Sequence, residues 1–265
     1  MSYGTLLRYP GSKWKVSKEI IKLFPHHKVY LEPFFGSGAI FFNKPQVRLE
    51  TINDKDNEVV NLFKVIRDHP NDMANKINYT PYSREEYMKS YEHSDNEIEK
   101  ARRFLVRMWQ AYGPKTNGSN PGWGRSIKYE GPNRPYQWSK VPGIILKITD
   151  RLKRTQIENK DATELIQEYD VPDSLIYLDP PYLLNTRNAK VTMYKHEYNT
   201  EDHEKLLNVI SNLKHAKIVI SSYENDLYEN YLKEWNKEEF NSYSIAGSLR
   251  KEVVYFNYRN KNKLF

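Results

Sequence analysis

The sequence predicts an α/β fold, in which a mostly parallel sheet ends in an antiparallel hairpin and is interrupted by an inserted, mainly helical and loop-rich module. Two observations lead to this prediction. Short apolar runs typical of strands alternate with segments of helical apolar spacing, over residues 16–66 and again after about residue 155. Between them, residues 67–154 are first polar and then rich in glycine, proline and aromatic side chains. We therefore expect one α/β domain, formed by residues 1–66 and 155–265, that carries an insertion.

The chain begins with a loop, a helix, a short strand and a glycine turn. Residues 16–24 place apolar side chains at helical spacing, after the turn-like stretch Tyr9-Pro10-Gly11-Ser12-Lys13. The apolar residues 29–31 predict a strand that ends at Glu32-Pro33. Phe34-Phe35-Gly36-Ser37-Gly38 then leads into a second helix. The order is therefore strand, glycine turn and helix.

A second strand and helix complete the first half of the sheet. Residues 48–52 predict a strand that closes on Asn53-Asp54-Lys55-Asp56, so acidic side chains again fall at a strand end. Residues 58–66 are apolar at helical spacing. This β-α-β-α pattern predicts parallel strands.

The alternation returns after the insertion and ends in a hairpin. We expect a helix over residues 162–168, a strand from Leu175 that leads into Asp179, a helix over 200–213 and a strand over 216–221. Two extended stretches, 239–245 and 252–258, are separated by Ala246-Gly247-Ser248 and predict a hairpin.

Inside the insertion, one segment has clear helical spacing. The side chains expected to face the core of a helix over residues 101–112 are Leu105, Met108, Trp109 and Tyr112.

The charge of the chain is positive and unevenly distributed. Lys and Arg number 41 against 34 Asp and Glu, which gives a net charge of +7. Residues 101–154 alone hold twelve basic and two acidic side chains, a net charge of +10. This segment favours a polyanion as partner.

Composition also excludes several classes of protein. The chain has no cysteine, which excludes disulfides, thiolate metal sites and cysteine nucleophiles. No His, Asp and Glu cluster has metal-ligand spacing, so no metal is expected. No apolar run approaches the roughly 20 residues of a membrane span, and the first residues lack a signal pattern. We therefore expect a cytoplasmic protein.

Residues Asp179-Pro180-Pro181-Tyr182 follow a buried strand and form the most informative motif. The strand delivers Asp179 to the carboxyl edge of the sheet, where open α/β folds bind ligands. Because proline cannot continue a helix, the Pro180 carbonyl stays free to accept a hydrogen bond. Tyr182 adds a flat face that suits a planar heterocycle. The carboxylate, the free carbonyl and the ring together indicate a binding site for an aromatic amine. The alternative is a strand end without a ligand, in which the aspartate lies on the surface and the tyrosine only packs.

The glycine turn predicts a small-molecule site. Gly36 and Gly38 allow a ligand to approach the backbone closely. The turn lacks the third glycine of the dinucleotide fingerprint, and the Lys-Ser/Thr of a P-loop is absent. Pyrophosphate is therefore not the favoured ligand.

Acidic side chains around the turn indicate which ligand fits. Glu32 precedes it, and Asp54 or Asp56 follows about 20 residues later, the separation at which an acid reaches ribose hydroxyls. A nucleoside with a positive centre and no phosphates would suit these acids. A structural turn, loop acids and a solvated Lys13 are the alternatives.

Taken together, these motifs resemble the D12 class of Dam-type DNA adenine N6-methyltransferases, which use S-adenosyl-L-methionine. The resemblance covers most of the chain: Tyr9 to Lys13, Glu32 to Gly38, Asn53-Asp54, Asp179 to Tyr182, and a stretch with Tyr194 and Tyr198. The order of cofactor motifs, variable module and catalytic tetrapeptide resembles the α group of amino-methyltransferases. The first motif departs from the pattern, with Tyr and Pro-Gly-Ser where Dam has Trp and Ala-Gly-Gly.

The resemblance implies a Rossmann-like methyltransferase sheet and a site-specific, adenine-specific DNA methyltransferase. The catalytic, cofactor-binding domain would be residues 1–66 and 155–265, and the DNA-recognition domain residues 67–154. The adenine would be flipped out of the duplex, and its amine would attack the methyl group directly. The implied catalytic residues are Asp179, Pro180, Pro181 and Tyr182; the implied cofactor-binding residues are Tyr9, Lys13, Glu32, Phe35, Gly36, Gly38, Asp54 and Asp179.

The insertion carries the expected DNA contacts. Its loop-rich part mixes basic, amide and aromatic side chains that can meet phosphates, base edges and exposed bases. The DNA-binding candidates are Asn117, Trp123, Arg125, Lys128 and Arg134. Arg125 is the strongest candidate for a groove contact.

Several alternatives stay open. The same chemistry on an RNA amine, a cytosine amine or a protein glutamine is one, and an inactive DNA-binding protein with the same fold is another. The missing cysteine excludes cytosine ring-carbon methylation, which needs a thiolate. We expect double-stranded DNA as partner, no membrane and a monomer in solution; an enzyme that acts alone and one paired with a separate restriction endonuclease both remain open.

Overall fold

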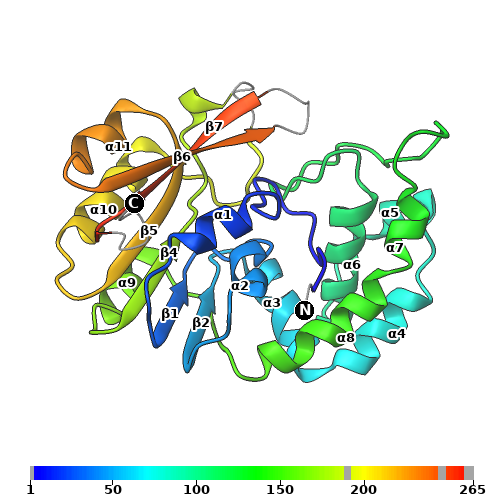
Figure 1. Cartoon of the computed structure of the whole chain (residues 1–265). Helices are drawn as coiled ribbons and strands as arrows, with labels where there is room; N and C mark the ends of the chain where they lie inside the picture. The colour runs from blue at the N-terminus through cyan, green and yellow to red at the C-terminus, as the bar shows by residue number, and fades with distance from the viewer. Residues whose placement is uncertain (1–2, 188–191, 244–248, 260–265) are drawn as a thin grey trace.

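A seven-stranded sheet runs through the part of the computed structural model that is described, residues 3–187, 192–243 and 249–259 (Figure 1). Its strands are β1 (Val29–Glu32), β2 (Leu49–Asn53), β3 (Gln156–Glu158), β4 (Ser174–Leu178), β5 (Lys217–Tyr223), β6 (Asn236–Tyr243) and β7 (Leu249–Phe256). The order is β3-β2-β1-β4-β5-β7-β6; the first five are parallel, whereas β7 runs antiparallel to both neighbours. The predicted α/β fold class and C-terminal hairpin are confirmed.

The strand register brings three strand ends to one edge. Leu31 of β1 lies opposite Thr51 of β2 and Ile176 of β4, and these three strands are parallel. Because the strands end one or two residues later, Glu32, Asn53 and Asp179, which directly follows β4, meet at the carboxyl edge of the sheet. The sequence predicted this gathering.

Strand β4 is buried on both faces. Leu175 and Tyr177 pack into one core cluster, and Ile176 and Leu178 pack into a second cluster on the other face. Such two-sided burial explains why β4 is continuously apolar rather than alternating.

Helices cover the two faces of the sheet. Their bounds are α1 (Ser17–Lys22), α2 (Ala39–Asn43), α3 (Asn57–Asp68), α9 (Ala162–Glu168), α10 (Thr200–Ser211) and α11 (Asp226–Tyr231), with a short 3-10 turn at Leu184–Thr186. Helix α3 begins where predicted because the Asp56 carboxylate accepts from the Glu58 N–H (3.0 Å). Helices α9, α10 and α11 contribute to the second core cluster, whereas α1, α2 and α3 contribute to the first.

The predicted insertion is mainly helical. It contains α4 (Pro70–Asn78), α5 (Arg84–Lys89), α6 (Glu97–Gln110), α7 (Arg134–Trp138) and α8 (Val141–Leu152), which lie together beside the sheet (Figure 1). Trp109 and Ile145 share the first core cluster with Tyr30 of the sheet. The insertion therefore packs against the sheet through a common core, and the division at residues 67 and 154 stays a prediction.

One expectation within the insertion is wrong. Leu105, Met108 and Trp109 are buried as predicted, but Tyr112 is 73% exposed. Helix α6 ends at Gln110, so Tyr112 lies beyond its last turn and leaves the helical face.

Strand β3 and helix α11 are among the elements that were not predicted. Strand β3 has only three residues, and α11 has six, so neither carries a long periodic pattern. The proposed hairpin turn Ala246-Gly247-Ser248 lies outside the described residues. Among the helices that are described, none is long and apolar enough to cross a membrane.

Candidate functional site

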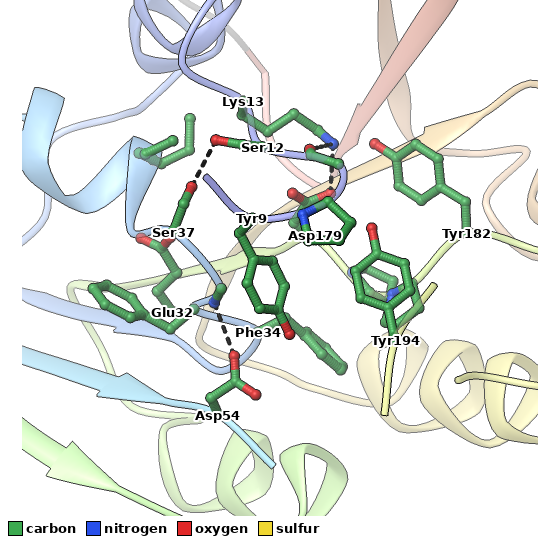
Figure 2. Close-up of a pocket in the computed structure, with 18 of the residues that line it drawn as sticks. Tyr9, Ser12, Lys13, Glu32, Phe34, Ser37, Asp54, Asp179, Tyr182 and Tyr194 are labelled. Carbon is green, nitrogen blue, oxygen red and sulfur yellow. Dashed lines mark hydrogen bonds and ion pairs between the residues drawn. The ribbon is translucent and has the colours of Figure 1, made fainter. Parts of the chain in front are cut away.

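A cavity of about 650 Å³ opens at the carboxyl edge of the sheet. Its walls come from the N-terminal loop, the glycine turn after β1, the loop after β4 and residues 193–198. Figure 2 shows side chains from these separate segments converging on one space. Seven of the eight predicted cofactor-binding residues line the cavity, the exception being Gly38. All four residues from Asp179 to Tyr182 also line it.

The glycine turn is built around Asp54. The Gly36 N–H donates to Asp54 Oδ2 (2.8 Å), and the Asp56 N–H donates to Asp54 Oδ1 (2.9 Å; Figure 2 shows the first bond). Gly36 and Gly38 have φ values of 47° and 64°. These conformations favour glycine. The carboxylate therefore fixes the turn against the end of β2.

Space around the turn also requires glycine. A Cβ at Gly36 would lie 2.9 Å from Cδ1 of Tyr9. A Cβ at Gly38 would lie 2.5 Å from Cζ of Phe35 and 2.7 Å from Cε2 of Phe42. Gly38 thus serves the packing of the turn, whereas Gly36 faces the cavity.

Two buried acids at this edge have raised pKa values. Burial raises the pKa of Glu32 to about 8, although Glu32 Oε2 accepts from the Tyr30 hydroxyl (2.6 Å). Burial raises the pKa of Asp54 to about 7, with Asp56 adding to the effect and backbone hydrogen bonds opposing it. The cavity therefore disfavours uncompensated negative charge.

Lys13 is buried and bound by the protein on all sides. Its Nζ donates to the Gly11 carbonyl (3.0 Å) and pairs with Asp179 Oδ1 (3.0 Å) and Glu252 Oε1 (3.2 Å). Burial alone would lower the pKa of Lys13, but Asp179 and Glu252 raise it above its ordinary value. Ser12 joins this loop to the glycine turn through Ser37 (2.7 Å between the hydroxyl oxygens; Figure 2).

Asp179 is a carboxylate with a perturbed pKa at the end of β4. Burial raises the pKa of Asp179 to about 6, Lys13 opposes the shift, and Glu252 adds to it. Asp179 is ionised at neutral pH and sits beside a fixed cation. Such a group is a candidate for catalysis.

Tyr182 is held on several sides. Its hydroxyl donates to Glu252 Oε1, and the Lys13 ammonium lies 4.6 Å from the ring centroid. The Tyr223 ring packs against it at 4.6 Å between centroids, with the planes at 75°. Glu252 was not predicted from sequence; the signal was an acidic residue directly before the apolar run 253–256, which is buried.

The loop after the tetrapeptide closes one wall. Glu197 accepts from the N–H groups of Met193 (2.6 Å) and Tyr194 (3.0 Å) and pairs with Arg187 (2.8 Å). The Tyr194 ring lies 5.9 Å from the Tyr9 ring between centroids, across the cavity mouth (Figure 2). Tyr194, quoted from sequence only as part of the resemblance, therefore lines the site.

The insertion touches this wall directly. The Thr116 N–H donates to the Met193 carbonyl (2.8 Å), and the Asn117 side chain donates to the Thr192 carbonyl (2.8 Å). Residues 116–117 of the insertion therefore contact residues 192–193 through one backbone and one side-chain hydrogen bond.

The five DNA-binding candidates divide into two groups. Asn117 bonds Thr192, Trp123 Nε1 donates to Gln110 Oε1 (3.3 Å), and Arg134 donates to the Ala111 carbonyl (3.0 Å). Arg125 and Lys128 are exposed, and within the described chain their side chains make no hydrogen bond or ion pair. The side chains of Arg125 and Lys128 are therefore free to contact an external partner, whereas those of the other three form hydrogen bonds within the protein.

Comparison with known proteins decides between the functions that the sequence left open. Residues 9–247 match the family model of the D12 class N6 adenine-specific DNA methyltransferases. The chain belongs to this family. The match spans strands β1 to β6 and the insertion between them, so the predicted DNA adenine-N6 methyltransferase is confirmed. Within the described residues, no group of three or more His, Cys, Asp or Glu side chains could hold a metal ion.

Two curated relatives of this D12-class methyltransferase match over nearly all of its length, and a third matches over about three quarters. A type II methyltransferase, M1.LlaDCHI of Lactococcus lactis subsp. cremoris, is 25% identical over 95% of this chain and 96% of its own. The type II methyltransferase M.MjaIII of Methanocaldococcus jannaschii is 24% identical over 96% of this chain and 98% of its own. A DNA adenine methylase of Haemophilus influenzae is 24% identical over 73% of this chain and 69% of its own.

Proposed function

We propose that this methyltransferase moves a methyl group from S-adenosylmethionine directly onto N6 of an adenine flipped out of duplex DNA. The observation that carries the proposal is the position of Asp179, which β4 places in the same cavity as the glycine turn and Tyr182. Donor and acceptor sites share one chamber. The reacting atoms can therefore meet without a covalent enzyme intermediate.

The cavity residues fit a nucleoside cofactor with a positive centre. The cavity volume lies within the range of about 300–1,000 Å³ found for small-ligand sites. The buried carboxyl groups of Glu32 and Asp54 have raised pKa values. A cationic ligand would stabilise their ionised forms. When bound, S-adenosylmethionine supplies an electrophilic methyl group on a sulfonium. We assign its site to Tyr9, Glu32, Phe35, Gly36 and Asp54, with Gly38 supporting the turn.

Asp179 and Pro180 activate the amine in this proposal. The lone pair of adenine N6 is delocalised into the ring, so the amine is a poor nucleophile until acceptors hold its two hydrogens. Lys13 occupies Asp179 Oδ1. We therefore assign one amine hydrogen to Asp179 Oδ2 and the other to the Pro180 carbonyl. The carboxylate also stabilises the positive charge that develops on nitrogen.

Tyr182 provides the stacking face for the base. A target atom inside a duplex is out of reach, so the nucleotide must leave the stack and enter a pocket. The rigid Pro180-Pro181 step places the Tyr182 ring next to the carboxylate. The ring would compensate for part of the stacking that the base loses.

Asp179→Ala tests the proposal. We expect methyl transfer to duplex DNA to be abolished in a labelled-methyl assay, because the amine loses its ionised acceptor. DNA binding in a gel-shift assay should stay close to wild type. Robust methyl transfer by Asp179→Ala would refute the assignment of the site.

The insertion recognises the DNA in this proposal. Arg125 and Lys128 lie on the exposed part of a segment with a net charge of +10. We assign Arg125 to a base edge and Lys128 to a phosphate. Arg125→Ala should then relax sequence preference, whereas Lys128→Ala should weaken binding on all sequences and reduce its salt dependence. If both changes only weakened binding uniformly, this division of roles would be wrong.

The broader setting is also a proposal. The Lactococcus and Methanocaldococcus relatives are named type II methyltransferases. We propose that this chain acts as a monomer on one recognition sequence, beside a separate restriction endonuclease. DNA methylated by the chain should then resist cleavage by that endonuclease, and light scattering of the free protein should give the mass of one chain.

A further inference from the structure

Glu252 is a buried carboxylate that the hairpin delivers to the site. Strand β7 runs antiparallel to β5, and Glu252 lies opposite Tyr223 at the last paired position of β5. The start of β7 therefore reaches the same carboxyl edge at which β4 ends. Glu252 is 4% exposed, whereas the four residues after it are apolar core. An isolated charge at such a position is costly, so its partners matter.

A single oxygen of Glu252 joins two groups of the site. Oε1 accepts from the Tyr182 hydroxyl and pairs with Lys13 Nζ at 3.2 Å. The same Lys13 Nζ pairs with Asp179 Oδ1 at 3.0 Å. Glu252, Lys13 and Asp179 therefore form a chain of charges that begins at the stacking ring and ends at the amine acceptor.

The ammonium of Lys13 has no donor left for a ligand. It carries three N–H bonds. Gly11, Asp179 and Glu252 supply three acceptors within 3.2 Å. Lys13 therefore acts on the protein side of the site, as the link between the two carboxylates.

We propose that Glu252 is a positioning residue for methyl transfer: its carboxylate fixes the Tyr182 ring and the Lys13 ammonium relative to each other, and so sets the stacked adenine against Asp179. The inference rests on the proposed function and adds a residue to it. The hydroxyl oxygen of Tyr182 lies on the long axis of the ring, so the bond to Glu252 fixes the far end of the side chain, and the Tyr223 ring at 4.6 Å and 75° limits rotation about this axis.

The charge of Glu252 has a second effect. Lys13, Asp179 and Glu252 together carry one net negative charge, which suits a site where positive charge moves from the methyl donor to the amine. Glu252 raises the pKa of Asp179, and Lys13 lowers it. Other described titratable groups that interact electrostatically with Asp179 include Glu32, Tyr177, Tyr182, Tyr194 and Tyr228.

The Glu252→Gln variant removes the negative charge of Glu252 but keeps the size and shape of the side chain. The amide still offers an oxygen to Tyr182 and Lys13, but the bonds lose their charge assistance. We expect kcat for DNA methylation to fall about tenfold, with a smaller change in KM for DNA. The acidic limb of the kcat profile should move to lower pH by about one unit, because Asp179 loses a like charge nearby. A purely structural role would not move this limb.

Glu239→Gln is the matched control. Glu239 lies on β6 of the same hairpin, where it forms an exposed pair with Lys251 (2.8 Å) away from the cavity. The same chemical change there should leave kcat and the pH profile at wild-type values.

A double-mutant cycle tests the bond itself. Tyr182→Phe keeps the ring and removes the hydroxyl, and we expect a loss in kcat of about tenfold. Glu252→Ala should cost about a hundredfold, because it releases both Tyr182 and Lys13. The double variant should be slower than Glu252→Ala by much less than the factor that Tyr182→Phe costs alone, since both changes break the same bond and only the interaction of the Tyr182 hydroxyl with Asp179 is lost in addition. Thermal melts confirm that each variant is folded, and Glu252→Gln carries the test if Glu252→Ala is not.

The outcomes are distinct. Wild-type kcat and an unshifted acidic limb in Glu252→Gln would overturn the inference, as would losses that multiply in the double variant. If Asp179→Ala is inactive while Glu252→Gln behaves as wild type, the role of Glu252 fails and the proposed function stands. If Asp179→Ala stays active, the proposed function itself fails.

Discussion

Lys13→Met removes the only cation that the structure places against Asp179 and Glu252, within the residues that it describes. Methionine preserves most of the length and apolar volume of the side chain. The Asp179 carboxylate is then left in a buried site beside a second carboxylate. Its pKa must rise, because burial and Glu252 both favour the protonated form.

The magnitude follows from the wild-type value. The pKa of Asp179 is about 6. An opposite charge within about 4–6 Å typically shifts a carboxyl pKa by 1–3 units, so its loss should bring Asp179 to about 8. The ionised fraction at pH 7 then falls from about nine-tenths to about one-tenth. The methylation rate at pH 7 should drop about tenfold and recover above pH 9, because Asp179 acts only when ionised.

The assay is single-turnover methyl transfer to duplex DNA at saturating cofactor, from pH 5 to pH 9.5. The wild-type rate should be nearly constant above pH 7 and fall about tenfold per pH unit below pH 6. Lys18→Met, an exposed lysine on α1, serves as control and should match wild type. A Lys13→Met rate that is equally low at every pH, or one with a wild-type limb, would refute this reasoning.

Two further predictions concern stability. Gly38→Ala should lower the free energy of unfolding by about 2–5 kcal/mol in urea titrations, since positive φ costs about 1–2 kcal/mol and overpacking about 1–3 kcal/mol. Gly118→Ala, at φ 80° with open space around its Cβ, should cost only the roughly 1–2 kcal/mol that positive φ costs. Equal losses in the two variants would contradict the packing account. Glu32, Asp54 and Asp179 have folded pKa values of about 8, 7 and 6, above their unfolded values. At these groups the folded protein binds more protons, and thermal midpoints without cofactor should fall as the pH rises from 7 to 8.5, where His27, His196 and His203, whose pKa values are lowered, are neutral in both states; midpoints that rise over this range would contradict these shifts.

Much of the sheet could be predicted because its strands are bounded by clear signals. The apolar run before Asp179 and the glycine turn after β1 both fix an element and its edge. Once parallel strands are inferred, Glu32, Asp54 and Asp179 must share that edge, and the structure places them so. Local pattern and topology were sufficient here.

Other parts of the site depend on contacts between distant segments. Nothing near Lys13 in the sequence indicates that Glu252 lies 3.2 Å away, since this contact requires the antiparallel return of β7. Likewise, nothing local in the sequence shows that the side chains of Asn117 and Arg134, predicted as DNA contacts, also donate to backbone carbonyls. A sequence indicates which side chains can bind, whereas packing decides which of them remain free.

The identity of the methylated nucleoside tests the central claim most directly. DNA from cells that express the wild-type chain should contain N6-methyladenine by mass spectrometry of its nucleosides, and methylation-sensitive sequencing should map it to one recognition sequence. DNA from cells that express Asp179→Ala should contain none above background. A methylated cytosine amine, methyl transfer to RNA or protein instead of DNA, or N6-methyladenine at wild-type level with Asp179→Ala would contradict the account.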